Sequence, residues 1–175
     1  MRRQKHPNNV VLIGMPGSGK TTVGVNLSRR IHKKFIDTDR LLSKQFGLKI
    51  SEIFAAHGEA AFRDAEADLC ESLLTCRHSV ISTGGGIIIR ASNRTMLRSI
   101  GKVVYLAPTF DTLWARLKHD KHRPLLQTES PEATLKALFE QRDPMYRDCA
   151  HRIIHILNQT PFQVAELIDR DLLMT

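Results

Sequence analysis

A glycine-rich stretch near the start of the chain, "GMPGSGKT" at residues 14–21, stands between an apolar run and a helical pattern. The run before it is "VVLI", and in the segment after it Val23, Leu27 and Ile31 recur every four residues, as on one face of a helix. The stretch matches GxxxxGK[ST], and a strand before it with a helix after it is the context in which this pattern binds phosphate. The sequence therefore predicts a P-loop that binds a nucleoside triphosphate.

The chemistry of a P-loop gives its residues expected roles. Glycine permits positive φ, which turns backbone N–H groups toward a phosphate, and the helix N-terminus adds a partial positive charge. Lys20 is expected to reach the β- and γ-phosphates, and the Thr21 hydroxyl is expected to bind Mg²⁺. The residues predicted to bind ATP in this region are Gly17, Ser18, Gly19, Lys20, Thr21 and Thr22, after Gly14 at the start of the loop.

Strands and helices alternate along the rest of the chain. The predicted strands are the apolar runs 10–13, 80–83 and 102–107, together with the segments 34–37 and 152–156. Further helix starts are expected at Thr109 or Asp111, at Ser130–Pro131 and at Thr160–Pro161. This alternation predicts an α/β fold with a parallel sheet covered by helices on both faces. A length of 175 residues suits one domain, 1–175.

The segment "KFIDTDR" places Asp37 and Asp39 two residues apart at the end of a predicted strand. In extended backbone both side chains would point to the same face, roughly 7 Å apart. Alternatively, Asp39 is only the N-cap of the helix that "RLLSKQF" begins. P-loop proteins usually carry a metal-binding acid at the end of another strand, and the run 80–83 is followed by glycines instead. Asp37 is therefore predicted to bind Mg²⁺, which leaves Asp39 to face the second substrate.

A triple glycine, Gly84, Gly85 and Gly86, follows the predicted strand 80–83. One interpretation is a flexible turn. The other is that a ligand approaches the backbone closely, where a side chain would collide and N–H groups are offered instead.

Composition excludes several classes of protein. The formal charge of +8 is spread over separate segments without aromatic residues between them, so nucleic acid is not an expected partner, and small anionic substrates explain the arginines as well. No apolar run approaches the roughly 20 residues of a membrane span, and the start of the chain lacks the apolar core of a secretion signal. The three cysteines lack CxxC spacing, which favours reduced thiols. A cytoplasmic protein is expected.

Taken together, the segments "GMPGSGKTT", "DTD", "IFAAHGEAAFR", "TGGG", "RPLL" and "RDPMY" resemble the shikimate kinase family in order and spacing over nearly the whole chain. The resemblance implies a three-layer P-loop kinase fold with five parallel strands and a mobile lid. It also implies transfer of the ATP γ-phosphoryl to the 3-hydroxyl of shikimate, a step of chorismate and aromatic amino acid biosynthesis. The implied cofactors are ATP and Mg²⁺, and a monomer is expected.

The resemblance assigns roles to individual residues. It implies that Asp39 contacts the reacting hydroxyl and that Asp37 reaches Mg²⁺. It further implies that Arg63 and Arg142 bind the substrate carboxylate beside the glycines at 84–86, and a guanidinium offers paired donors that match two carboxylate oxygens. Glu66 follows Arg63 at i+3, so on a helix it is expected to hold that guanidinium in place.

Two other segments receive roles from the same resemblance. A substrate-binding helical segment is implied at about 40–70, and a lid at about 117–130, in which Arg123 is placed on the transferring phosphate. Arg116 and Gln159 correspond to positions beside the adenine. The predicted catalytic residues are Asp39, Lys20 and Arg123.

Three rival functions remain open at the level of sequence. A gluconate-type sugar acid kinase would be expected to show His-Pro shortly after its acid pair, where this chain has "RLLS". A nucleotide kinase would need a second base-reading segment, and none is evident. An ATP-dependent nucleic-acid binder would use the P-loop without a phosphoryl acceptor, and its hydrolysis would fall steeply with salt.

Overall fold

The computed structural model describes residues 8–120 and 127–173. Five parallel strands form one sheet in the order β2-β3-β1-β4-β5. They are β1 (Val10–Ile13), β2 (Lys34–Asp37), β3 (Ser79–Ser82), β4 (Lys102–Pro108) and β5 (Arg152–Ile156). All five predicted strands are confirmed, including those at 34–37 and 152–156.

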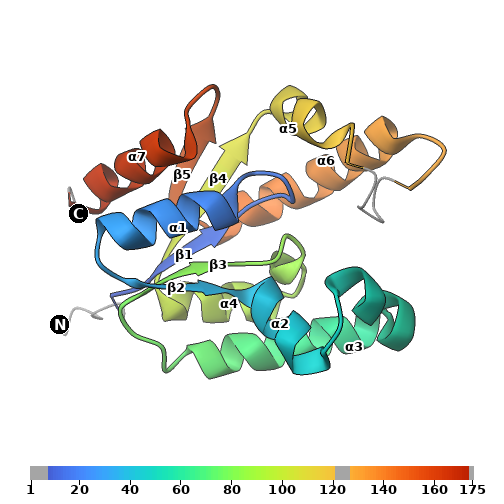
Figure 1. Ribbon diagram of the computed structural model, residues 1–175, viewed down its shortest axis with the longest axis horizontal. Helices are drawn as coiled ribbons and strands as arrows, with labels where there is room; N and C mark the ends of the chain where they lie inside the picture. The colour runs from blue at the N-terminus through green and yellow to red at the C-terminus, as the bar shows by residue number, and fades with distance from the viewer. Residues whose placement is uncertain (1–7, 121–126, 174–175) are drawn as a thin grey trace.

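Helices cover both faces of the sheet (Figure 1). Their bounds are α1 (Lys20–Arg30), α2 (Thr38–Phe46), α3 (Ile50–Leu73), η1 (Ile87–Ile89), α4 (Ala91–Ile100), α5 (Phe110–Leu117), α6 (Pro131–Cys149) and α7 (Pro161–Leu173). Helices α1 and α7 share one apolar cluster with the sheet, and α3, α4 and α6 share another with its opposite face. The predicted three-layer arrangement is therefore confirmed.

The central strand β1 shows why the sheet needs both layers. Val10 and Leu12 pack in the cluster with α1 and α7, whereas Val11 and Ile13 pack in the cluster on the other face. Successive side chains of a strand point to opposite faces. A continuous apolar run such as this one is therefore buried only when helices lie on both sides.

Most helix starts follow the signals in the sequence. Thr109, not Asp111, is the N-cap of α5, because its hydroxyl accepts a 3.2 Å hydrogen bond from the Thr112 N–H. Pro131 and Pro161 are the first residues of α6 and α7, where proline loses no hydrogen bond. Within α3, Gly58 has φ 80° and ψ 168°, so the helix is interrupted there. This break was not expected from the sequence.

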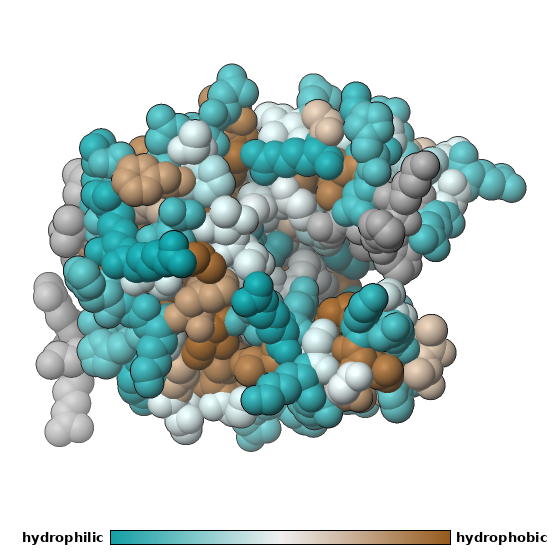
Figure 2. All heavy atoms as spheres, in the orientation of Figure 1, coloured by the Kyte–Doolittle hydropathy of each residue, from teal (hydrophilic) through white to brown (hydrophobic). Residues whose placement is uncertain are grey.

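The loops that follow the five strands all lie at one edge of the sheet. In a parallel α/β sheet, ligands bind in the crevice outside the carboxyl ends of the strands. Figure 2 shows this side of the molecule hollowed between the part that contains α2 and α3 and the part that contains α5 and α6. Within the described ranges, no helix is long and apolar enough to cross a membrane.

The three thiols differ in their surroundings. Burial raises the pKa of Cys70 to about 12 and that of Cys149 to about 11, while Cys76 is only partly buried. Because the thiolate is the reactive form, we expect iodoacetamide at pH 8 to modify Cys76 first, and the other two only after unfolding. Timed labelling followed by peptide mass spectrometry measures this order. Equal rates at Cys70 and Cys76 would contradict the burial of Cys70 on α3.

Candidate active site

The P-loop connects β1 to α1 through glycines in the left-handed region. Gly17 has φ 82° and Gly19 has φ 91°, which non-glycine residues rarely adopt. At Gly17 the neighbouring helix adds a second restriction, because a Cβ there would lie 2.8 Å from Cδ2 of Leu117. Gly19 is also the N-cap of α1, so the loop leads directly into the N-terminus of that helix. This confirms the predicted strand, loop and helix.

Lys20 is buried against the P-loop backbone. Its Nζ donates to the carbonyl oxygens of Gly14 at 2.7 Å and Met15 at 2.9 Å, and to Oγ of Ser18 at 3.4 Å. Ser18 is buried as well. The ammonium charge is thus held on the loop, within reach of an anion that the loop N–H groups would bind.

Thr21 and Asp37, the two predicted Mg²⁺ ligands, meet at the carboxyl end of β2. The Thr21 hydroxyl donates a 2.8 Å hydrogen bond to Oδ2 of Asp37. Hydroxyl and carboxylate oxygens are ligands that suit Mg²⁺, which usually takes one or two protein groups and completes its shell with phosphate and water. Within the described residues no group of three or more His, Cys, Asp or Glu side chains could hold a metal by itself. The donor set therefore fits a phosphate-bound magnesium ion.

The backbone of the acid pair differs from both sequence interpretations. Asp37, not Asp39, is the N-cap of α2, and its Oδ1 accepts from the Arg40 N–H at 3.2 Å. The helix already begins at Thr38, whose hydroxyl accepts from the Gly84 N–H at 3.0 Å. This bond ties the start of α2 to the triple glycine. Asp39 consequently lies in the first helical turn, and the two acids do not share a strand.

Asp39 nevertheless lies against the triple glycine. A Cβ on Gly84 would lie 2.6 Å from Oδ1 of Asp39 and 3.2 Å from Oε1 of Glu66. Both carboxylates therefore lie against the Gly84 backbone, and a side chain at this position would displace Asp39. Burial, with a smaller contribution from Asp39, raises the pKa of Glu66, while the Arg63 guanidinium opposes that rise.

Arg63 is held by acids on its own helix. Its Nη1 forms a 2.5 Å ion pair with Glu66, and its Nη2 forms a 3.2 Å ion pair with Glu59. The predicted i+3 contact between Arg63 and Glu66 is confirmed. A Cβ on Gly86 would lie 2.6 Å from Nη2 of Arg63, so the guanidinium packs directly on the glycine turn.

Arg142 reaches the same place from α6. The side chain is only 7% exposed, and within the described ranges its buried Nε–H has no hydrogen-bond partner. Burial lowers the pKa of Arg142, and the charge of Arg63 lowers it further. Two guanidinium groups close enough to repel, one of them with an unpaired buried donor, form a site suited to an anion.

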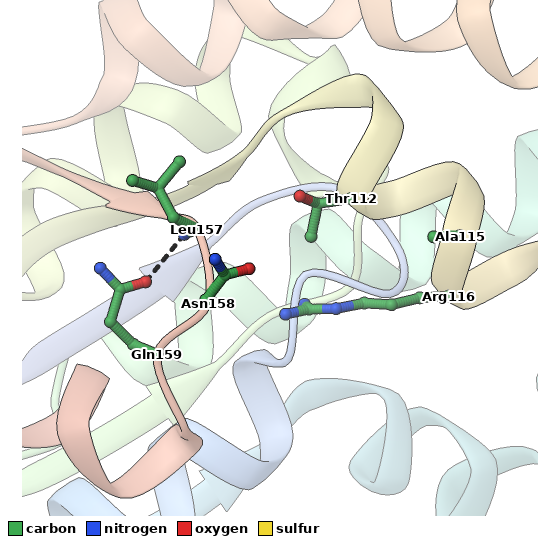
Figure 3. Close-up of a pocket in the computed structure, with 6 residues that line it drawn as sticks. All are labelled: Thr112, Ala115, Arg116, Leu157, Asn158 and Gln159. Atoms are coloured by element: carbon green, nitrogen blue, oxygen red, sulfur yellow. Dashed lines mark hydrogen bonds between the residues drawn. The ribbon is translucent and has the colours of Figure 1, made fainter.

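A pocket lies on the other side of the P-loop, between α5 and the loop after β5 (Figure 3). Its lining residues are Thr112, Ala115, Arg116, Leu157, Asn158 and Gln159. Nη1 of Arg116 donates to the Gly17 carbonyl at 3.2 Å, and Oε1 of Gln159 accepts from the Leu157 N–H at 2.7 Å. The structure thus places Arg116 and Gln159 in one pocket that adjoins the P-loop.

One predicted site residue lies outside the described residues, and two further residues join the site. Arg123 is the residue outside, within the segment 121–126 of the predicted lid. Thr38 and Tyr146 were missed, and both contact the triple glycine. Tyr146 follows Arg142 at i+4 within "RDPMY", and this spacing, which brings helical side chains together, was the signal that could have found it.

Comparisons with known proteins agree with this geometry. The family model described as shikimate kinase matches residues 16–172. The shikimate kinase of Nitrosospira multiformis is 43% identical over 164 residues, which are 94% of this chain and 84% of that protein. The shikimate kinase of Burkholderia pseudomallei is 47% identical over 146 residues, 83% of this chain and 79% of that protein.

The fold also agrees with that of a known structure. The structure of shikimate kinase from Acinetobacter baumannii in complex with shikimate superimposes with a TM-score of 0.91 at 37% identity, over 98% of this chain and 95% of that one. The P-loop lies beside an anion site built from two arginines, and the chain is similar to these proteins over most of its length. These findings lead to one family assignment. The chain belongs to the shikimate kinase family.

Proposed function

We propose that this protein transfers the γ-phosphoryl group of ATP to the 3-hydroxyl of shikimate, giving shikimate 3-phosphate and ADP for chorismate and aromatic amino acid biosynthesis. The family's reaction is the ATP-dependent phosphorylation of shikimate, and the choice of hydroxyl is the finer part of the proposal. The observation that carries it is the meeting of Arg63, Arg142 and Asp39 at the triple glycine, beside the P-loop.

The two arginines would bind the carboxylate of the acceptor. The buried Nε–H of Arg142 offers a donor without a partner among the described residues, and Arg63 is held ready by Glu66. A carboxylate would neutralise part of their mutual repulsion and accept their hydrogen bonds. This clamp fixes one end of the ring, so that a hydroxyl at the other end is presented to Asp39.

Asp39 would orient that hydroxyl and accept its proton. Phosphoryl transfer of this kind passes through a loose transition state, so alignment and charge stabilisation do most of the work. Lys20 would place its ammonium on the transferring group. Thr21 and Asp37 would hold Mg²⁺, which when bound neutralises phosphate charge.

The remaining site assignments belong to the same proposal. Arg116 and Gln159 would lie beside the adenine in the pocket that adjoins the P-loop. Arg123, in the predicted lid, would stabilise the charge on the phosphate, and closure would keep water from competing as acceptor. A monomeric, cytoplasmic enzyme made of one domain that spans 1–175 completes the proposal.

ADP release from the purified protein tests this function. With Mg²⁺ and ATP present, four parallel reactions contain no acceptor, shikimate, gluconate or AMP. We expect release that depends on shikimate alone, and a product whose phosphate NMR coupling places the ester on the 3-position. Release with gluconate or AMP would overturn the acceptor site, whereas release without any acceptor would point to an ATPase.

The Gly86 turn gives a prediction about substrate affinity. Gly86→Ala introduces a Cβ 2.6 Å from Nη2 of Arg63 at an ordinary backbone φ of −93°. The clash should displace the guanidinium and raise the KM for shikimate at least about tenfold, the loss of roughly one charged hydrogen bond. Steady-state kinetics with shikimate varied measures this effect.

Gly47→Ala is the matched control for that substitution. Gly47 has φ 67°, and a Cβ added there would have no heavy atom within 4 Å, so alanine adds backbone strain without a clash. Its melting temperature should fall while the KM for shikimate stays within twofold of wild type. An equal KM change in both variants would contradict the contact between Gly86 and Arg63.

A further inference from the structure

Tyr146 lies where three parts of the candidate site meet. Its side chain is fully buried. The hydroxyl donates a 2.5 Å hydrogen bond to the carbonyl oxygen of Gly85 and lies 3.9 Å from the sulfur of Met15 in the P-loop. The guanidinium of Arg142, one helical turn earlier on α6, lies close enough to this hydroxyl to oppose the rise that burial causes in the pKa of Tyr146. The hydroxyl oxygen thus contacts the glycine turn and the P-loop and lies beside a substrate-binding arginine.

The hydrogen-bonding capacity of each group determines the direction of these interactions. A carbonyl oxygen only accepts and a guanidinium only donates, whereas a phenol has one proton to donate and can also accept. Tyr146 therefore donates to Gly85, and its lone pairs remain available to accept from the neighbouring Arg142 guanidinium. If the hydroxyl is removed, the Gly85 carbonyl loses its donor and the Arg142 guanidinium loses a neighbouring acceptor, in a buried region where an unpaired polar group is costly.

Tyr105 provides an internal comparison. Its ring stacks on the ring of Tyr146, with centroids 4.9 Å apart and an interplanar angle of 24°, and both rings are fully buried. Its hydroxyl, however, donates at 2.7 Å to Asp143, whose other carboxylate oxygen accepts from Arg147 at 2.6 Å. The two stacked tyrosines therefore form hydrogen bonds with different groups, and of the two only Tyr146 reaches the substrate-binding residues.

We propose that Tyr146 is a positioning residue for shikimate binding. Its hydroxyl holds the Gly85 turn and the Arg142 guanidinium at a fixed separation, so that both face the carboxylate of the acceptor together. Tyr146 acts through these two groups and needs no contact of its own with shikimate or ATP. The inference rests on the proposed function, because it explains how the carboxylate clamp of that function is kept in place.

Two single-hydroxyl deletions test the inference in the full chain. Wild type, Tyr146→Phe and Tyr105→Phe are compared by ADP release with shikimate varied and then with ATP varied, and by thermal melting. Tyr146→Phe should raise the KM for shikimate about tenfold, as expected for one hydrogen bond in a buried charged network, with the KM for ATP within twofold and kcat lowered less than threefold. Tyr105→Phe should lower the melting temperature and leave the KM for shikimate within twofold.

The outcomes separate the possibilities. Equal KM values for shikimate in the two variants would overturn the inference and leave Tyr146 a purely structural residue. Absence of shikimate-dependent release by the wild type would refute the proposed function itself, and the inference with it. Shikimate-dependent release by the wild type with an unchanged KM in Tyr146→Phe would refute the inference alone.

A second substitution covers the case in which Tyr146→Phe does not fold. Incorporation of 3-fluorotyrosine at position 146 keeps the ring and the hydroxyl but makes the oxygen a weaker acceptor for Arg142. The KM for shikimate should then rise at least twofold, with the melting temperature close to that of wild type. A KM equal to that of wild type would overturn the role of the hydroxyl.

Discussion

Asp39→Asn should lower kcat by about 10²-fold or more, as loss of a general base typically does, while the affinity for ATP stays near that of wild type. The amide has nearly the shape of the carboxylate, so it fits against Gly84, but it cannot accept the proton of the hydroxyl. Removal of the Asp39 charge also removes one cause of the raised pKa of Glu66. The ion pair between Glu66 and Arg63 should therefore persist.

The measurement is shikimate-dependent ADP release for kcat, with isothermal titration calorimetry for ATP. Asp64→Asn is the control, since Asp64 lies on α3, pairs with Arg90 at 2.6 Å and has a side chain that is 68% exposed. Its kcat should stay within twofold of wild type. Near-normal turnover in Asp39→Asn would remove Asp39 from the mechanism.

Arg63→Ala should weaken shikimate binding by roughly 3 kcal/mol, or about 10²-fold in KM, because it leaves a carboxylate without its paired donors. The KM for ATP should change little, since the polar contacts of Arg63 are with α3 and its guanidinium packs on the triple glycine. Arg90→Ala is the matched control, because Arg90 pairs with the exposed Asp64 instead. Unchanged kinetics for both substrates in Arg63→Ala would count against the clamp.

The same variant predicts a pH dependence of stability. Without Arg63, Glu66 loses the cation that lowers its pKa, so burial raises the folded-state pKa still further above the unfolded value. The loss of stability relative to wild type should be small below the unfolded pKa and should grow as pH rises toward the folded one. Melting temperatures across a series of buffers from acidic to neutral pH measure it. The double variant Arg63→Ala/Glu66→Gln should recover stability at neutral pH but keep the high KM, which separates structural damage from loss of the clamp.

The strands were the most predictable part of the fold. The runs at 10–13 and 102–107 are buried on both faces, so their continuous apolar sequence directly indicates buried strands. The run at 34–37 is only partly buried, so its apolar pattern is weaker. The P-loop was predictable because its backbone requires positive φ, and the glycines that permit positive φ are visible in the sequence.

The acid pair shows where local reasoning failed. Spacing suggested that Asp37 and Asp39 share an extended backbone, but the bond from the Gly84 N–H to Thr38 lies between residues 46 positions apart. A contact of that range, formed when β2 and β3 pair, has no local signature. Tyr146 was missed for a similar reason. The sequence predicts only that an aromatic residue on such a helix packs in the core, whereas the contact of its hydroxyl with Gly85 is visible only in the structure.

The position of the candidate site at one end of the parallel strands has a practical consequence for work with this enzyme. All the groups assigned to substrates follow the carboxyl ends of strands or lie on helices beside that edge, whereas the turns before β2, β3 and β5 lie at the opposite edge. Two of these turns hold His32 and His78 with positive φ. Fluorescent probes, affinity handles and fusion partners belong at this opposite edge, away from the groups assigned to substrates.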